Sequence, residues 1–280
     1  MDFSEKDREY VAKLVRQQSS NTARPASVTQ MHLQLKPIVH DSGARNVSEL
    51  MKMLRTAPPA NLHRVVAEAM TIKETSFFRD VAPFKLLEDR LIPELIVRRR
   101  AERRLRLWSA ASSTGQEAYS LAILLRDRFQ ELEDWDVQIF GTDISQLACE
   151  YARSGRYSRL EINRGLPVRL LLRYFERDGE EWRVCEELRR LVTFERANLC
   201  EPPPRGLRSY GMQFDLVLLR NVLLYFAPED RSQVLHETCA RMHPGAALLL
   251  GNAEQAEDFS DLFQVEFDKN CYFYRPVSVR

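Results

Sequence analysis

The feature that most constrains the fold is an alternation of short apolar runs with helical segments from residue 105 onward. Apolar runs occupy residues 105–111 and 137–143, a third lies within 214–226, and each is followed by residues with helical periodicity. A fourth run follows a Pro-Gly turn at 244–245, and the alternating residues 263–276 indicate a closing antiparallel pair. Strands that alternate with helices predict a mostly parallel sheet covered by helices on both faces, an α/β fold.

Two stretches lie outside this alternation. Residues 1–84 show helical spacing interrupted by loops, which predicts a helical N-terminal domain with a linker and leaves residues 85–280 for the α/β domain. The Asp178-Gly179 pair is a turn signal between strand-forming residues. It predicts a small β-hairpin subdomain at about residues 172–191, inserted into the α/β domain.

Charge and composition exclude several classes of protein. The chain has 41 Lys and Arg against 40 Asp and Glu, so we expect no nucleic-acid partner. No apolar run reaches the roughly 18 residues that a spanning helix needs, and the first residues are charged, so we expect a cytoplasmic protein without membrane insertion or secretory signal. Five cysteines without a CxxC pair and five histidines without an HExxH motif predict no metal.

The residues that follow the predicted strands indicate a ligand, because ligands of open parallel sheets bind beyond the carboxyl ends of the strands. Small residues at 110–117 allow a close approach to the backbone, and neither GxGxxG nor GxxxxGK[ST] is present. Asp143 ends the second strand, where a carboxylate either accepts hydrogen bonds from ribose hydroxyls or caps the next helix. With Asn198, Arg220 and Asn221 after later strands, the pattern favours a nucleoside-like ligand without a pyrophosphate, of which S-adenosylmethionine is the commonest.

Seven segments extend this pattern over about residues 60–275. They are residues 75–79, 107–122, 141–145, 155–157, 198–199, 214–226 and 244–254. In order and spacing, the sequence resembles the CheR-type chemotaxis receptor methyltransferases. The resemblance implies a Rossmann-like S-adenosylmethionine-dependent methyltransferase domain with a small inserted antiparallel β-subdomain, preceded by a helical N-terminal domain.

The resemblance also implies an activity and a site. The family transfers a methyl group from S-adenosyl-L-methionine to glutamate side chains on chemoreceptor cytoplasmic helices, leaving S-adenosyl-L-homocysteine. We therefore expect a cytoplasmic monomer that acts on chemoreceptors or on a receptor-like protein. The implied cofactor-binding residues are Thr75, Arg79, Glu117, Asp143, Asn198, Leu199, Arg220 and Asn221, and the implied transfer-site residues are Arg79 and Tyr225. Among these, Glu117 would hold the amino-acid part of the cofactor, Asp143 its ribose, and Asn198 and Leu199 its adenine.

Three departures from the family pattern bear on these expectations. Residues 28–46 contain only Lys36 and Arg45, where the family usually presents a basic helix to the acidic receptor. The hairpin turn within residues 177–184 is short, so we expect no tethering to a receptor's C-terminal pentapeptide.

The third departure lies in the cofactor turn. Gln116 and Ala118 replace residues that are frequently Glu and Pro, but Glu117 is retained, so we expect cofactor binding to survive. Two alternatives to receptor methylation stay open. One is a methyltransferase for a different protein or small molecule, and the other is a non-catalytic S-adenosylmethionine-binding signalling module. The retained site residues count against the second.

Overall fold

The chain forms two compact units in the computed structural model. The first comprises Met1–Ile72 and Leu224–Arg231, and the second comprises Lys73–Leu223 and Ser232–Arg280. The structure describes residues 3–20, 22, 27–56, 58–59, 61–71, 74–202, 213–256 and 259–277.

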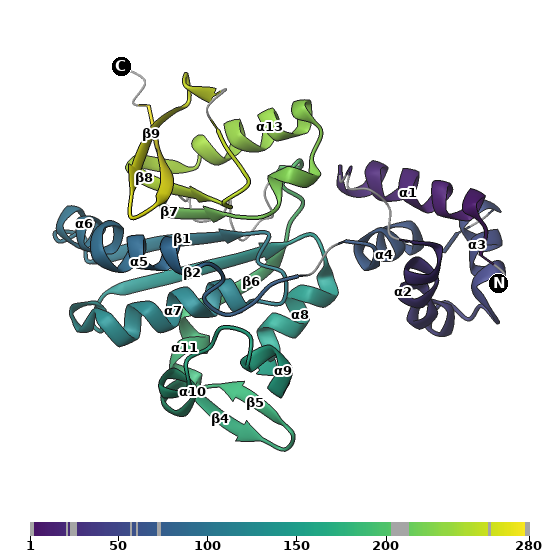
Figure 1. The fold of residues 1–280 in the computed structure, drawn as a ribbon, viewed down its shortest axis with the longest axis horizontal. Coiled ribbons are helices and arrows are strands. Elements are labelled where there is room, and N and C mark those ends of the chain that lie inside the picture. Colours follow the sequence, from purple (N-terminus) through teal and green to yellow (C-terminus); the bar gives the residue numbers. More distant parts are fainter. Residues whose placement is uncertain are drawn as a thin grey trace. The chain divides into compact units, whose positions relative to one another are not determined.

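Helices make up the N-terminal part of the first unit, which confirms the predicted helical character (Figure 1). They are α1 (Glu5–Ser19), α2 (Val28–Asp41), α3 (Val47–Thr56) and α4 (Leu62–Ala69). Helix α1 begins at a capping box, in which Ser4 and Asp7 bond each other's backbone N–H groups. Val11, Leu35 and Leu50 are fully buried in a hydrophobic core that these helices form together with Phe3 and Ala44.

A seven-stranded sheet forms the centre of the second unit, with the order β6-β2-β1-β7-β8-β10-β9. Its strands are β1 (Arg104–Ala110), β2 (Asp136–Asp143), β6 (Val192–Arg196), β7 (Phe214–Leu219), β8 (Met242–Leu250), β9 (Phe263–Asp268) and β10 (Cys271–Pro276). The five strands from β6 to β8 pair in parallel, and β10 pairs antiparallel with both β8 and β9. The predicted parallel sheet with a closing antiparallel pair is therefore confirmed.

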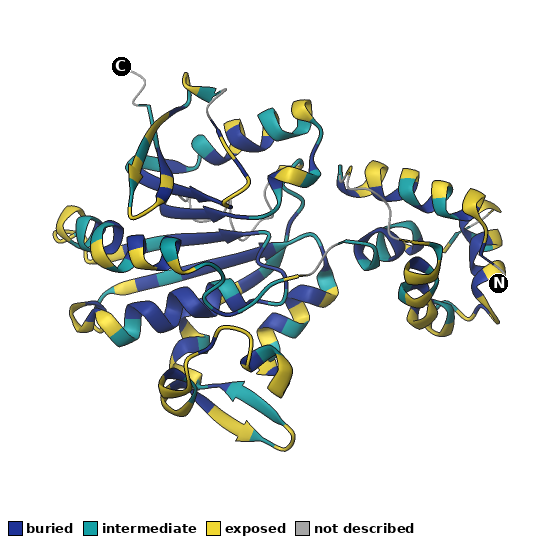
Figure 2. Cartoon of the chain, in the orientation of Figure 1, coloured by how far each residue is buried: buried dark blue, intermediate teal, exposed yellow. Residues whose placement is uncertain are grey.

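The central strands are apolar because helices cover them. Every residue of β7 is buried, and Figure 2 shows the central sheet as largely buried. Helix α7 (Gln116–Arg128) packs against β1, β2 and β6, and α5 (Val81–Leu86) packs against β10. Other helical elements, outside the inserted segment described below, are η1 (Leu87–Leu91), a π-helical turn, with α6 (Ile92–Arg98), η2 (Gln130–Leu132), α8 (Gln146–Ser154), η3 (Leu223–Tyr225) and α13 (Pro228–Cys239). Among the described residues, no helix has both the length and the apolar character needed to span a bilayer.

A small antiparallel sheet is inserted between α8 and β6, as predicted. It has the order β3-β5-β4, and the segment contains β3 (Arg156–Tyr157), α9 (Arg159–Ile162), α10 (Val168–Tyr174), β4 (Phe175–Asp178), β5 (Glu181–Val184) and α11 (Glu186–Leu191). The hairpin turns at Gly179, which adopts a φ of 65° and has open space where a side chain would begin. The two-residue strand β3 was not predicted, because two residues carry no detectable period.

Asp127 joins this inserted segment to α7. Its side chain is only 5% exposed and accepts two hydrogen bonds from Arg169, at 2.9 and 2.6 Å, and one from Arg173 at 3.1 Å. The hydrogen bonds from Arg169 hold the pKa of the Asp127 carboxyl below its usual value, although partial burial opposes them.

Asp127→Asn is expected to lower the free energy of unfolding by about 1–2 kcal/mol at neutral pH, since the arginine partners are themselves half exposed. The pKa of Asp127 is lower in the folded than in the unfolded chain. Its contribution is therefore fully present above about pH 4 and is lost as the pH falls through the folded-state pKa. Urea unfolding of both proteins across this range checks the prediction. A difference that grows on acidification would contradict it.

Candidate functional site

A tight turn after β1 lies at the carboxyl end of the sheet, where Gly115 has a φ of 95°. A Cβ atom at Gly115 would lie 2.8 Å from Ala152 Cβ and 2.9 Å from Phe194 Cζ, so only glycine fits. The hydroxyl of the fully buried Tyr157 donates to the Thr114 carbonyl at 2.8 Å. The turn that the small residues predict is therefore closely packed against Ala152, Tyr157 and Phe194.

Asp143 joins this turn to the end of β2. Its Oδ2 accepts the Ser113 N–H at 2.8 Å, and its Oδ1 accepts the Ser145 N–H at 2.9 Å. The N-cap of α8 is Ser145, whose side chain accepts the Ala148 N–H, so the alternative that Asp143 caps this helix is wrong. An ionised carboxylate has about four lone-pair sites and accepts hydrogen bonds from several donors at once.

Ser112 supplies an observation that fits a ligand at this turn. Its hydroxyl is buried and has no hydrogen-bond partner within the part of the chain that the structure describes. A buried hydroxyl without a partner is costly and is normally satisfied by water or a ligand. The turn thus offers a polar atom to a bound nucleoside-like molecule.

Arg220 connects the turn region to a segment far away in the sequence. Its side chain is 1% exposed, and its Nη1 donates to Glu117 Oε2 at 3.0 Å. Its Nη2 donates to Asp80 Oδ2 at 2.8 Å and to the Arg79 carbonyl at 2.9 Å. The second oxygen of Glu117 accepts the Ser109 hydroxyl at 2.8 Å. We call Asp80, Ser109, Glu117 and Arg220 the Arg220 cluster.

The segment before α5 is anchored by its aromatic residues. Phe77 is fully buried, and its ring centroid lies 5.0 Å from that of Tyr157, so its side chain belongs to the core. Phe78 donates its N–H to Ser120 Oγ at 2.9 Å. The half-buried Arg79 donates from Nη1 to the Glu74 carbonyl at 2.9 Å. Thr75 lies at the start of the same segment and is also half-buried.

Glu254 holds the loop that contains Asn221, and sequence reasoning assigned it no role. The side chain is buried and accepts backbone N–H groups from Asn221, Val222 and Gly251, at 2.6, 2.7 and 2.7 Å. Asn221 has a φ of 59°, a conformation that most residues avoid. The sequence feature that could have indicated this role is the position of Glu254, three residues after Gly251, the glycine that follows β8.

The remaining predicted site residues lie on other loops. Asn198 follows β6 and donates from Nδ2 to Glu201 Oε1 at 3.0 Å, and the neighbouring Leu199 is half-buried. Tyr225 ends η3 and belongs to the first compact unit. There its carbonyl accepts the Thr22 N–H at 2.6 Å and the Thr22 hydroxyl at 2.9 Å. The second unit therefore brings together Arg79, Glu117 and Arg220, with Asp143 at the adjoining turn.

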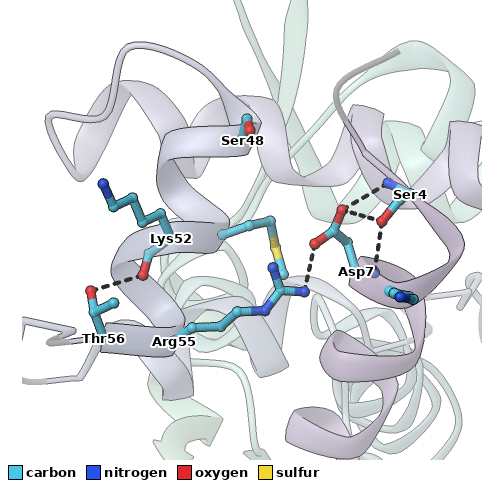
Figure 3. A pocket seen from close by; sticks show the side chains of 8 residues that line it. Ser4, Asp7, Ser48, Lys52, Arg55 and Thr56 are labelled. Carbon is cyan, nitrogen blue, oxygen red and sulfur yellow. Dashed lines mark hydrogen bonds and ion pairs between the residues drawn. The ribbon is translucent and has the colours of Figure 1, made fainter.

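A pocket of about 630 Å³ lies in the first unit (Figure 3). It is lined by Ser4, Lys6, Asp7, Ser48, Met51, Lys52, Arg55 and Thr56. Arg55 donates to Asp7 at 2.6 Å, and although partial burial opposes it, hydrogen bonds from Ser4 and Arg55 lower the pKa of the Asp7 carboxyl. The ion pair between Asp7 and Arg55 joins α1 to α3. The residues that line the pocket include none of the predicted site residues. Among the described residues, no group of three or more His, Cys, Asp or Glu side chains is arranged to hold a metal ion.

Comparison with known proteins identifies a family whose model this chain matches. Residues 73–271 match the model of the CheR methyltransferase, SAM binding domain. The chain is 36% identical to Chemotaxis protein methyltransferase 1 of Vibrio cholerae serotype O1 over 82% of both chains. It is also 36% identical to Chemotaxis protein methyltransferase 1 of Pseudomonas aeruginosa, over 82% of this chain and 83% of that protein.

Proposed function

Since this chain belongs to the CheR methyltransferase family, we propose that it transfers methyl groups to glutamate side chains of chemoreceptors and forms glutamate methyl esters. The matched domain binds S-adenosylmethionine, so the chain is an S-adenosylmethionine-dependent methyltransferase. The observation that best supports the finer proposal is the Arg220 cluster. Through Arg220 it joins Glu117, proposed to bind the cofactor, to the backbone of Arg79, proposed to bind the substrate.

The proposed reaction needs no general base from the protein. A free glutamate side chain has a pKa of about 4.3, so at neutral pH it is already a carboxylate nucleophile. Bound S-adenosylmethionine supplies the activated methyl group. The remaining task for the chain's own residues is to align the carboxylate oxygen with the methyl carbon and to exclude water, and such positioning supplies roughly 7–11 kcal/mol.

Each predicted site residue has a part in this proposal. Glu117 accepts hydrogen bonds from the amino group of the cofactor, and Asp143 accepts those of its ribose hydroxyls. Asn198 and Leu199 flank the adenine. Thr75, Arg79, Arg220 and Asn221 line the methionine end. Arg79 orients the substrate carboxylate, because a guanidinium binds a carboxylate through paired hydrogen bonds, and Tyr225 donates a further one.

Arg79→Ala is expected to lower kcat by about tenfold to hundredfold, since a misplaced reacting group costs up to about 10²-fold. Its effect on the affinity for S-adenosyl-L-homocysteine is expected to be smaller. Initial rates of methyl transfer and calorimetric titration with the product measure the two quantities. Arg100→Ala is the control, because Arg100 is an exposed arginine of the same unit. Normal turnover with unchanged substrate affinity would contradict the role proposed for Arg79.

Receptor methylation itself is tested with radiolabelled S-adenosylmethionine and receptor cytoplasmic fragments from the same cell, with and without their C-terminal tails. Base-labile label on both fragments is expected. The tight turn at Gly179 between β4 and β5 supports methylation without a tether. Label on the tailed fragment alone would support receptor methylation but contradict the proposal that methylation needs no tether.

A second candidate function keeps the methyltransferase and changes its substrate to another protein or a small carboxylate. The observation that favours it is the composition of α2, which contains Lys36 as its one Lys or Arg residue. No label on either receptor fragment, despite calorimetric binding of the cofactor, would favour this candidate.

A further inference from the structure

Asp80 lies at the start of α5, where a carboxylate usually caps the helix, but its side chain bonds Arg220 instead. It is the N-cap of α5, a position at which the side chain usually accepts an N–H group of the first turn. Within the described chain, the Asp80 side chain makes no such cap bond. Its Oδ2 instead accepts Arg220 Nη2 at 2.8 Å, and the same nitrogen donates to the Arg79 carbonyl at 2.9 Å.

The backbone around Arg79 is strained on both sides. Phe78 has a φ of 47°, and Asp80 has a φ of 63° with a ψ of 123°. Residues other than glycine adopt such conformations rarely, and they persist only where the surroundings hold them. On one side the Phe78 N–H is held by Ser120 Oγ at 2.9 Å. On the other side the holding group is Arg220.

Arg220 is a rigid anchor for this turn. It is 1% exposed, and its other terminal nitrogen is held by Glu117, which is itself only 13% exposed. The Asp80 carboxylate and the Arg79 carbonyl are therefore fixed to the end of β7. We infer that Asp80 is a positioning residue for methyl transfer, because with Arg220 it holds the strained turn that presents Arg79. The inference rests on the role proposed above for Arg79 in orienting the substrate carboxylate.

Asp80→Gly tests the inference while protecting the fold, because glycine adopts the observed φ without strain and lacks the anchoring carboxylate. We expect kcat to fall about tenfold to hundredfold, the range that a misplaced group costs. Asp80→Asn retains an oxygen acceptor for Arg220 and is expected to recover much of the loss. Amide hydrogen exchange measured by mass spectrometry is expected to rise at residues 74–81 in Asp80→Gly.

The double variant with Arg79→Ala separates positioning from a general structural effect. If Asp80 acts through Arg79, Asp80→Gly lowers kcat by less than about twofold further in the Arg79→Ala background. Asp127→Asn is the matched control, since it removes another ion-paired carboxylate of the same unit, and its kcat is expected to stay within twofold of the unmodified protein.

Three results would overturn the inference. One is a normal kcat in Asp80→Gly, and another is unchanged hydrogen exchange at residues 74–81. The third is a double variant whose loss equals the product of the two single losses. A normal kcat in Arg79→Ala would instead show that the role proposed for Arg79 is wrong, and the inference would fall with it.

Discussion

Arg220→Met is expected to lower the free energy of unfolding by about 3–5 kcal/mol and to remove methyl transfer. The guanidinium is 1% exposed and balances two carboxylates, those of Asp80 and Glu117. Methionine fills much of the volume but leaves both carboxylates without their cation. Removing one partner of a buried ion pair costs more than the pair contributes, because the remaining charge stays desolvated, and this applies most to Glu117, whose side chain is 13% exposed.

Urea unfolding measures the stability of Arg220→Met, and transfer of radiolabelled methyl groups measures its activity. Arg98→Met is the matched control, since Arg98 is exposed and bonds only the Pro244 carbonyl among the described contacts. It is expected to change the free energy of unfolding by less than about 0.5 kcal/mol. Equal stabilities of the two variants would show that the Arg220 cluster contributes little to the fold.

Glu254→Ala is expected to lower the free energy of unfolding by about 2–4 kcal/mol. The substitution removes the acceptor of three backbone N–H groups, and each buried donor without a partner costs about 1–3 kcal/mol before water enters the space that the side chain leaves. Asn221 also loses the bond that holds its positive φ. We therefore expect methyl transfer to fall together with stability.

Thermal and urea unfolding measure the effect of Glu254→Ala. Glu237→Ala is its control, because Glu237 is half exposed and pairs with Arg241 on the surface. Exposed ion pairs contribute about 0–1 kcal/mol, so the control is expected to unfold near the unmodified protein. A Glu254 variant no less stable than this control would contradict the prediction.

The central sheet could be predicted because its strands carry a strong local signal. Strand β7 is buried at every position, and its sequence is apolar except for the buried Asp215. The hairpin could be predicted from the Asp178-Gly179 pair. Strand β3 could not, since its two residues form a strand only through pairing with β5. The π-helical turn of η1 likewise has no separate pattern within the longer helical stretch.

Sequence position alone points to the residues of the candidate site, but not to the contacts among them. Asp143 and the turn after β1 follow from their places at the ends of strands. The bond between Asp80 and Arg220 joins residues 140 positions apart, and no local pattern records which carboxylate meets which arginine. Glu254 was missed for a similar reason, because its partners are backbone N–H groups on two separate loops.

The insertion between α8 and β6 has an evolutionary consequence. The inserted segment is one continuous stretch of the chain between α8 and β6. At its turn, a Cβ atom placed on Gly179 would have no neighbouring atom within 4 Å. Residues can be added there without displacing β1, β2 or β7, whose ends carry the site. Insertions at this hairpin are therefore expected to be tolerated as the sequence evolves, because they leave the strand ends of the candidate site in place.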